Sequence, residues 1–270
     1  MTLELRSQAL HCLSLNDPDT KCQAVKVLRE QYLQGQVSLK TTEKMSAEGI
    51  QIPGRPEQPL LVNPGLVKRR SMVTEEGRAV LMHALAHIEF NAINLALDAI
   101  WRFDGLPKDY YEDWLKVASE EAYHFQLLNG YLKDQGFSYG VFPAHNSLWE
   151  MVSKTTDSIL ARMALVPRTM ESRGLDALPP ITEKLEQAHD HEAVRILQII
   201  LNDEIGHVEI GNRWFNHECQ RQQLDPIQAY ADLAQKYEAP KLRGPFNYSA
   251  RKAAGFTDAE LEALDIKQTT

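Results

Sequence analysis

Cysteine is scarce in this sequence, and the layout of an export signal is missing. The 270 residues include three cysteines, Cys12, Cys22 and Cys219. An odd and small number of cysteines does not make a disulfide framework, so we expect reduced thiols and a cytoplasmic protein. The N-terminal segment, Met1-Thr2-Leu3-Glu4-Leu5-Arg6, lacks the basic-then-apolar order of a signal peptide.

Long apolar runs and an excess of positive charge are also absent. No run approaches the roughly 20 apolar residues that a helix needs to cross a bilayer, so we expect no membrane span. Lys and Arg number 29 against 37 Asp and Glu, which gives a net charge of −8. This balance argues against binding nucleic acid through a broad electrostatic surface and leaves room for a local basic patch. With 43% hydrophobic residues the composition is that of a soluble globular protein.

The most informative feature is a motif that occurs twice. Glu120-Glu121-Ala122-Tyr123-His124 and Asp203-Glu204-Ile205-Gly206-His207 both read as an acid followed by Glu-x-x-His. On an α-helix, residues i and i+3 lie on one face, about 5–6 Å apart. A carboxylate and an imidazole at this spacing can bind one metal ion, so each motif predicts half of a metal site.

A lone glutamate precedes each motif at nearly the same distance. Glu89 lies 32 positions before Glu121 (121 − 89), and Glu171 lies 33 before Glu204 (204 − 171). Two helical hairpins of this kind supply the inward-facing ligands of four-helix di-iron and di-manganese carboxylate proteins. The sequence therefore predicts an all-α four-helix bundle in which two metal ions are bound. The six predicted ligands are Glu89, Glu121, His124, Glu171, Glu204 and His207.

Each predicted ligand has a less specific interpretation. The two Glu-x-x-His motifs could lie on solvated helix faces, but Ile200, Leu201 and Ile205 around Glu204 favour burial, where unpaired carboxylates are rare. Glu89 lies in an apolar run, which makes a surface role hard to support. Glu171 could equally belong to a polar helix end.

Other polar residues near the motifs have open roles. Ligating histidines usually donate their second N–H to an acid or carbonyl, so Glu120 and Asp203 are predicted to support the ligands, with an exposed helical acid as the alternative for Glu120. Tyr123 could be a redox-active phenol or a packed tyrosine with its hydroxyl hydrogen-bonded. His83 and His87 form a pair one turn apart, but His87 is about 200° round the helix from Glu89, and we interpret both as structural.

The expected organisation has three parts. Residues 1–72 form an N-terminal helix and a proline-rich extended arm packed on the bundle, residues 73–217 form the bundle, and residues 218–270 form a helical tail. The first expected helix starts at Asn16-Asp17-Pro18, and the last begins at Thr257-Asp258-Ala259-Glu260, a capping-box pattern. The four expected bundle helices run from Thr74 to Phe103, from Lys108 to Lys133, from near Ser147 past Pro167 to Glu171, and over Glu192–Phe215. A further helix is expected at 225–237.

Proline interrupts these patterns in three places. The arm, Ile50–Leu66, has too many prolines for a helix, and we expect it to pack through Ile52, Leu60, Leu61 and Val62. Pro167 deprives the carbonyl of Met163 of its helical donor, which predicts either a kinked or widened turn or a simple break. Pro179 and Pro180 predict a break in the third helix.

The tail combines cations and aromatic residues in an otherwise acidic chain. Such residues suit an anionic or planar ligand, which would make the tail a lid over the site. The alternative is that the cations pair with acidic groups of the bundle. The residues are Lys236, Tyr237, Lys241, Arg243, Phe246, Tyr248, Arg251 and Lys252.

Three runs carry a family resemblance: His87-Ile88-Glu89-Phe90-Asn91-Ala92-Ile93, Pro167-Arg168-Thr169-Met170-Glu171-Ser172-Arg173-Gly174-Leu175-Asp176, and Asp203-Glu204-Ile205-Gly206-His207. Together with Ile52–Pro56 and Phe246–Arg251 they resemble an uncharacterised bacterial family of ferritin-like proteins, a domain of unknown function. The resemblance implies a ferritin-like bundle with a dinuclear site and a distant similarity to diiron hydroxylases that modify tRNA. Two Glu-x-x-His motifs bring the chain closer to rubrerythrin, bacterioferritin and O₂-activating oxygenases than to ferritin, whose ferroxidase site usually has one.

We therefore expect an O₂-dependent diiron oxidoreductase, a hydroxylase or oxidase of a small or anionic organic substrate. The expected cofactor is two iron ions, with Mn/Fe left open, and the electron donor and a homodimer are also open. One alternative is a ferroxidase or peroxide-handling protein without an organic substrate. The other is a non-enzymatic, metal-stabilised interaction module.

Overall fold

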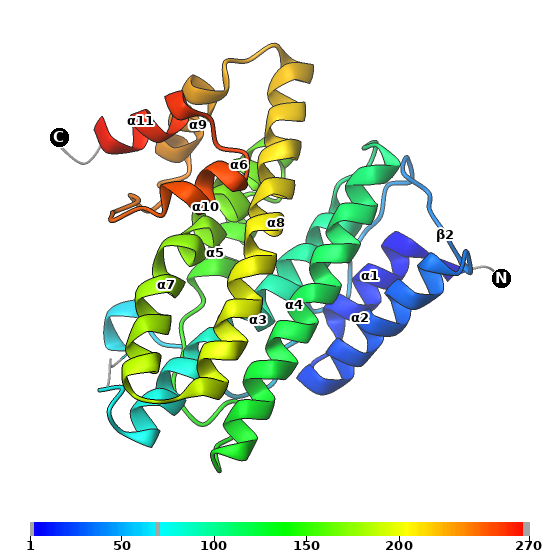
Figure 1. The fold of residues 1–270 in the computed structure, drawn as a ribbon. Helices are drawn as coiled ribbons and strands as arrows, with labels where there is room; N and C mark the ends of the chain where they lie inside the picture. The colour runs from blue at the N-terminus through cyan, green and yellow to red at the C-terminus, as the bar shows by residue number, and fades with distance from the viewer. Residues whose placement is uncertain (1–2, 68–70, 267–270) are drawn as a thin grey trace. The chain divides into compact units, whose positions relative to one another are not determined.

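The computed structural model describes residues 3–67 and 71–266 (Figure 1). Helices make up nearly all of its regular structure, and the strands it describes are a parallel pair, β1 (Leu3–Glu4) and β2 (Val37–Ser38). The all-α fold of packed helices is therefore confirmed. Packing divides the chain into unit 1, Met1–Trp149, and unit 2, Glu150–Thr270. The three-part organisation expected from the sequence stays a prediction.

Unit 1 is organised around a hairpin of two long helices, α3 and α4, joined by a five-residue connection. The helix α1 packs against α3, and α2 packs against α4. Asp17 caps α2 directly before Pro18, and the Thr74 hydroxyl caps α3 by accepting from the Gly77 amide at 3.1 Å. The sequence-based starts of these helices are thus confirmed. The helices are α1 (Leu5–Ser14), α2 (Pro18–Leu33), α3 (Glu75–Arg102) and α4 (Lys108–Asp134).

The helix α3 is the buried centre of unit 1. Although no uninterrupted apolar run is long enough, α3 as a whole has the length and composition that could cross a membrane. Its most apolar stretch is 78% buried inside the protein, which is the environment of a core helix in a globular protein. The expected cytoplasmic location stays a prediction.

The arm is extended, as predicted, apart from one 3₁₀ turn, η1 (Pro64–Leu66). It is held at two points. The Gly54 amide donates to the Leu13 carbonyl of α1 at 2.8 Å, and a Cβ on Gly54 would lie 2.1 Å from the Ser14 oxygen, so this approach requires glycine. Farther along, Leu61 forms a β-bridge with Ala144.

The side chains that anchor the arm differ from those expected. Leu60 was predicted to pack, but it is 60% exposed. Ile52 is half-buried, whereas Pro53 and Pro59 are buried. Leu61 and Val62 are also half-buried, so backbone hydrogen bonds and proline rings fix the arm together with three of the four predicted aliphatic side chains.

Unit 2 contains the second long hairpin, in which α8 packs against α6, a π-helical segment η2, and α7. The expected single helix from Ser147 to Glu171 is wrong, because α5 ends at Lys154 and α6 begins after a Ser158 cap. The elements are α6 (Ile159–Leu165), η2 (Val166–Glu171), α7 (Ser172–Gln187), α8 (His191–Gln222), α9 (Pro226–Lys236), α10 (Tyr248–Ala253) and α11 (Asp258–Ile266), with α5 (Ser147–Lys154) crossing the boundary between the units.

Pro167 widens the helix rather than ending it, which decides between the two outcomes left open by the sequence. The π segment places Pro167 near its start and Glu171 at its end. The Thr169 hydroxyl donates to the Ala164 carbonyl at 2.7 Å and so helps to satisfy the widened turn. The proline ring rests on Gly211 of α8, where a Cβ would lie 2.5 Å from the Pro167 Cβ.

Pro179 and Pro180 do not break the helix, so that prediction is wrong. The helix α7 continues through both residues to Gln187. Pro179 has no N–H for the Leu175 carbonyl, and the Asn247 side-chain amide donates to that oxygen instead at 3.1 Å. A side chain of the tail thus compensates for the proline.

The tail contributes to the core of unit 2. The helices α9 and α11 match the sequence-based prediction, and α10 was missed. In α11 the capping box is present, because the Thr257 amide donates to Glu260 at 2.8 Å and the Glu260 amide donates to the Thr257 hydroxyl at 3.3 Å. The shared core consists of Leu175, Val208, Ala250, Ala254, Phe256 and Leu261.

Two cationic side chains of the tail form ion pairs with carboxylates. Arg251 is fully buried and donates to both carboxylate oxygens of Asp176, at 3.0 and 2.6 Å. Lys252 pairs with Asp258 at 2.6 Å. Arg251 follows the structural alternative, because Asp176 belongs to the bundle, whereas the partner of Lys252 lies in the tail itself. A lid formed by the tail stays a prediction.

Candidate metal centre

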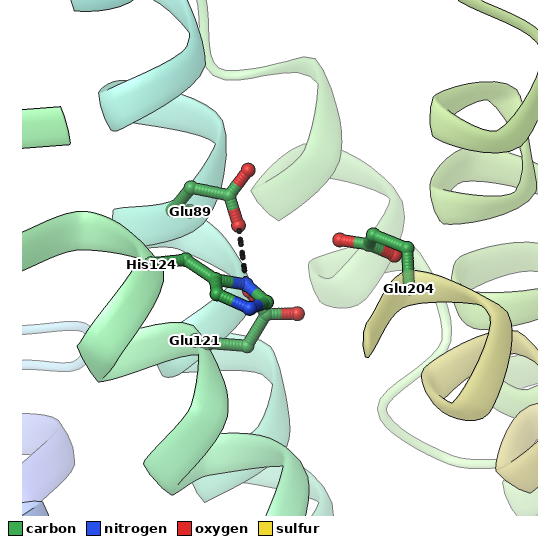
Figure 2. Close-up of side chains that lie close together, drawn as sticks. All are labelled: Glu89, Glu121, His124 and Glu204. Atoms are coloured by element: carbon green, nitrogen blue, oxygen red, sulfur yellow. Dashed lines mark hydrogen bonds and ion pairs between the residues drawn. The ribbon is translucent and has the colours of Figure 1, made fainter. Parts of the chain in front are cut away.

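In unit 1, three of the predicted ligands meet between α3 and α4. Glu89 comes from α3, and Glu121 and His124 come from α4 (Figure 2). The His124 Nδ1 atom lies 3.3 Å from Glu121 Oε2 and 3.5 Å from Glu89 Oε2. Glu121 and His124 are fully buried, and Glu89 is 3% exposed. We call these three residues the first triad.

The first triad concentrates negative charge in the interior. Burial, together with the neighbouring Glu121 carboxylate, raises the pKa of Glu89 above its ordinary value of 4.5. A cation bound between the carboxylates would offset both effects. Two oxygen ligands and one imidazole nitrogen also suit iron or manganese, so the residues present fit such an ion.

The remaining predicted ligands lie in unit 2, and we use the name second triad for Glu171, Glu204 and His207. Glu171 is the last residue of the π segment, and Glu204 and His207 lie on α8. All three are buried, and the separation of His207 Nδ1 from Glu204 Oε2 is 4.0 Å. Figure 2 draws Glu204 in addition to the first triad. The burial of Glu171 removes the alternative of a polar helix end exposed to solvent.

The arrangement therefore includes a buried cluster of glutamate and histidine side chains that could bind a metal ion. In the first triad the donor atoms all lie within 4.8 Å of one another. The helical hairpin explains this closeness, because Glu121 and His124 are one turn apart and Glu89 is brought level by the opposing helix. The number and identity of the ions stay predictions.

The residues predicted to support the ligands lie at the edges of the triads. Glu120 pairs with Lys116 at 3.0 Å, which favours the alternative of a solvated acid on the helix. Tyr123 is 47% exposed, so the interpretation as a packed tyrosine is wrong. Asp203 is half-buried, and its carboxylate accepts from the Asn202 amide at 3.4 Å. A supporting role for Glu120, Asp203 or Tyr123 stays a prediction.

His83 and His87 belong to a separate network around Tyr139. His83 accepts from the Gly140 amide at 2.8 Å and stacks on the Tyr139 ring. His87 Nδ1 lies 2.8 Å from the Tyr139 hydroxyl. Burial lowers the pKa of each histidine to about 4, so both rings are neutral near pH 7.

Sequence reasoning missed Arg168, which fixes the π segment that carries Glu171. Arg168 is 4% exposed and donates to Asn212 at 2.7 Å and to Glu260 at 2.5 Å. Its guanidinium also lies over the Phe256 ring, 4.6 Å from the centroid. The sequence signal for this role was the position of Arg168, between Pro167 and the predicted ligand Glu171.

The fold and site define an all-α protein with a buried glutamate–histidine cluster able to bind a metal ion. Residues 14–262 match a family described as "Protein of unknown function (DUF455)", and the chain belongs to this family. An uncharacterized protein of Haemophilus influenzae is 46% identical over 269 residues, covering 95% of this chain and 92% of the relative. No solved structure matches the chain. Membership of the ferritin-like superfamily stays a prediction.

Proposed function

We propose that the two triads together hold two iron ions and that the protein is an O₂-dependent oxidoreductase of a small organic substrate. The observation that carries the proposal is the first triad, in which two buried carboxylates and an imidazole converge. The same residue types recur in the second triad at nearly equal spacing along the chain. A mixed Mn/Fe pair uses the same ligands.

The proposal joins the triads because each one is incomplete as a dinuclear site. In carboxylate-bridged proteins, two helices each supply a glutamate and two others each supply a Glu-x-x-His pair. Glu89 and Glu171 correspond to the lone glutamates, and the motifs at Glu121 and Glu204 correspond to the pairs. This repeat in the sequence is what supports one shared centre.

Bound iron would supply electrons to O₂ and open coordination positions beside it. The side chains hold the charges in place before any ion arrives. Burial of the first triad excludes water, and the raised pKa of Glu89 means that its carboxyl group holds a proton more readily than an exposed glutamate. Binding a cation displaces that proton, so metal affinity rises with pH.

The π segment also supports this function. A π-helical turn is rare and is often found at functional sites. Here the π segment ends at Glu171, and its widened backbone sets the position from which the Glu171 side chain extends. Pro167 accounts for the widening, and the extra residue in the turn rotates the residues that follow it, Glu171 among them, relative to a regular helix.

The test is anaerobic loading with Fe²⁺ followed by exposure to O₂, monitored optically and by O₂ consumption. Glu121→Gln and Glu204→Gln should each lose most of the O₂-dependent signal. Glu209→Gln, an exposed residue on α8, is the matched control and should keep it. A wild-type protein that binds no iron would refute the proposal.

The same experiment separates the other functions. Repeated consumption of Fe²⁺ and peroxide without an organic compound would indicate a ferroxidase or peroxide-handling protein. Stable iron without O₂ consumption would indicate a metal-stabilised interaction module. The organic substrate, the electron donor and any tRNA or anionic partner would be sought only after O₂ consumption is established.

A further inference from the structure

Unit 1 contains a pocket of about 310 Å³ between the arm and α3. Such a volume has room for roughly ten water molecules and lies within the range of small-molecule sites. We call the part lined by His87, Phe90 and Asn91 of α3 its floor, and Tyr139 lines the pocket as well. Arg55, Glu57 and other residues of the arm also contribute to the lining.

The pocket is distinct from the first triad. His87, Phe90 and Asn91 are at helical positions i, i+3 and i+4, which place them on one face of α3. Glu89 is two residues from both His87 and Asn91, which is about 200° round the helix. The pocket therefore opens on the side of α3 away from the first triad, and its occupant would not be a metal ligand.

The arm, which lines one part of the pocket, is held by hydrogen bonds at both of its ends. At one end the Gly54 carbonyl accepts from the buried Lys21 ammonium at 2.7 Å. At the other end the Ala144 amide donates to Leu60 at 3.0 Å, and Val62 donates back to Ala144 at 2.8 Å. The arm is thus held apart from the floor between two attachments, so the space is preformed.

The floor is lined by neutral hydrogen-bonding groups. The Asn91 amide donates to His87 Nε2 at 3.1 Å, which leaves the ring proton on Nδ1. That proton points to the Tyr139 oxygen at 2.8 Å, so the Tyr139 hydroxyl keeps its own hydrogen for another acceptor. The Phe90 ring provides an apolar surface beside these groups.

The mouth carries charge. Arg55 and Glu57 are both exposed and line the pocket, and the Arg55 guanidinium lies 3.5 Å from the Asn146 amide oxygen, a weak contact. A guanidinium with spare donors binds a carboxylate through charge-assisted hydrogen bonds. Glu57 offers a partner for an amino group next to that carboxylate.

We propose that this pocket binds a small organic carboxylate with a hydroxyl or carbonyl group at its far end. The carboxylate lies at Arg55, the body of the ligand lies against Phe90, and the far polar group bonds to the Tyr139 hydroxyl. Because the ligand contacts both the arm and α3, its binding holds the arm in place. This site does not depend on the proposed metal function.

The test uses 4-hydroxybenzoate and L-tyrosine as probes, with Kd measured by calorimetry and the site located by amide chemical shifts. We expect millimolar or tighter binding of at least one probe, with shifts confined to residues 51–61, 87–91 and 139–146. The uncharged analogue 4-hydroxybenzamide should bind about tenfold more weakly than 4-hydroxybenzoate.

Variants assign the binding to this pocket. Arg55→Gln should weaken probe binding about tenfold, whereas Lys26→Gln, at an exposed position on α2, should leave it unchanged. Glu121→Gln should also leave it unchanged, which separates this pocket from the metal centre. Binding of neither probe below 10 mM would overturn the proposal. Equal binding to the wild type and Arg55→Gln, or a loss of binding in Glu121→Gln, would do the same.

Discussion

The two hairpins hold the same ligand types in helices of different regularity. In unit 1, α3 and α4 are uninterrupted, and the cost of the site is electrostatic, because Glu89 and Glu121 are buried next to each other. In unit 2, the corresponding helix is divided into α6, η2 and α7, and its backbone is widened before Glu171. A repeated ligand spacing can therefore be supported by two different helix geometries.

The hairpins also differ in what supports them. The first is covered by α1 and α2, which pack along regular helices. The second depends on particular contacts around the irregular segment: Gly211 under Pro167, Asn247 on the Leu175 carbonyl, and Arg168 bound to Glu260. We expect single substitutions at these contacts to damage unit 2 more than comparable changes damage unit 1.

The largest expected effect is that of Arg168→Met. It leaves the buried Glu260 carboxylate without its guanidinium, and removing one partner of a buried ion pair costs about 3–5 kcal/mol. The free energy of unfolding would be measured by urea denaturation. Glu192→Gln, which removes an exposed pair with Arg195, should cost less than about 1 kcal/mol. A loss below 1 kcal/mol for Arg168→Met would show that the tail does not support the π segment.

Glycine substitutions compare the hairpins directly. Gly211→Ala should cost about 1–3 kcal/mol, because the new Cβ would lie 2.5 Å from the Pro167 Cβ. Gly130→Ala on α4 meets nothing within 4 Å and should stabilise the helix by about 0.5–1 kcal/mol. Both are measured by thermal and urea unfolding. Equal effects would remove the distinction between a regular and a supported hairpin.

A pH-dependent comparison concerns the electrostatic cost of the first triad. The pKa of Glu89 is raised in the folded state, so its contribution to stability is full below pH 4.5 and is lost as the pH rises through the folded-state pKa. Metal-free Glu89→Gln should therefore be more stable than the metal-free wild type near pH 8, by about 1.4 kcal/mol for each unit of pKa difference.

Unfolding of both proteins between pH 5 and 8 would check this expectation. The wild type should lose stability relative to Glu89→Gln as the pH rises, and bound metal should reduce the difference. A wild type that gains stability relative to the variant over this range would mean that Glu89 has a compensating partner other than a metal ion.

Much of the regular part of the molecule could be predicted from sequence. Thr74 and Asp17 mark helix starts through local hydrogen bonds, and the Glu-x-x-His pattern places Glu121 and His124 on one helix face through local geometry alone. The position of Glu89 opposite Glu121 could be predicted because the helix that carries Glu89 is uninterrupted up to the turn. Local signals are sufficient wherever the backbone is regular.

The irregular parts depend on contacts that are distant in sequence. Pro179 appeared to end a helix, but the Asn247 amide, far along the chain, satisfies the Leu175 carbonyl. Leu60 was expected to pack because it is apolar, yet the arm is held by its backbone at Gly54 and at the bridge to Ala144. Such compensation is invisible in a local pattern.

The central claim is that both triads bind metal in one coupled centre. The most direct measurement is Mössbauer spectroscopy of protein loaded with ⁵⁷Fe²⁺ and exposed to O₂, combined with iron analysis. The account predicts two irons per chain in a single spin-coupled, diamagnetic species, reduced by Glu121→Gln and by Glu204→Gln. One magnetically isolated iron per chain, retained in the Glu204→Gln variant, would contradict it.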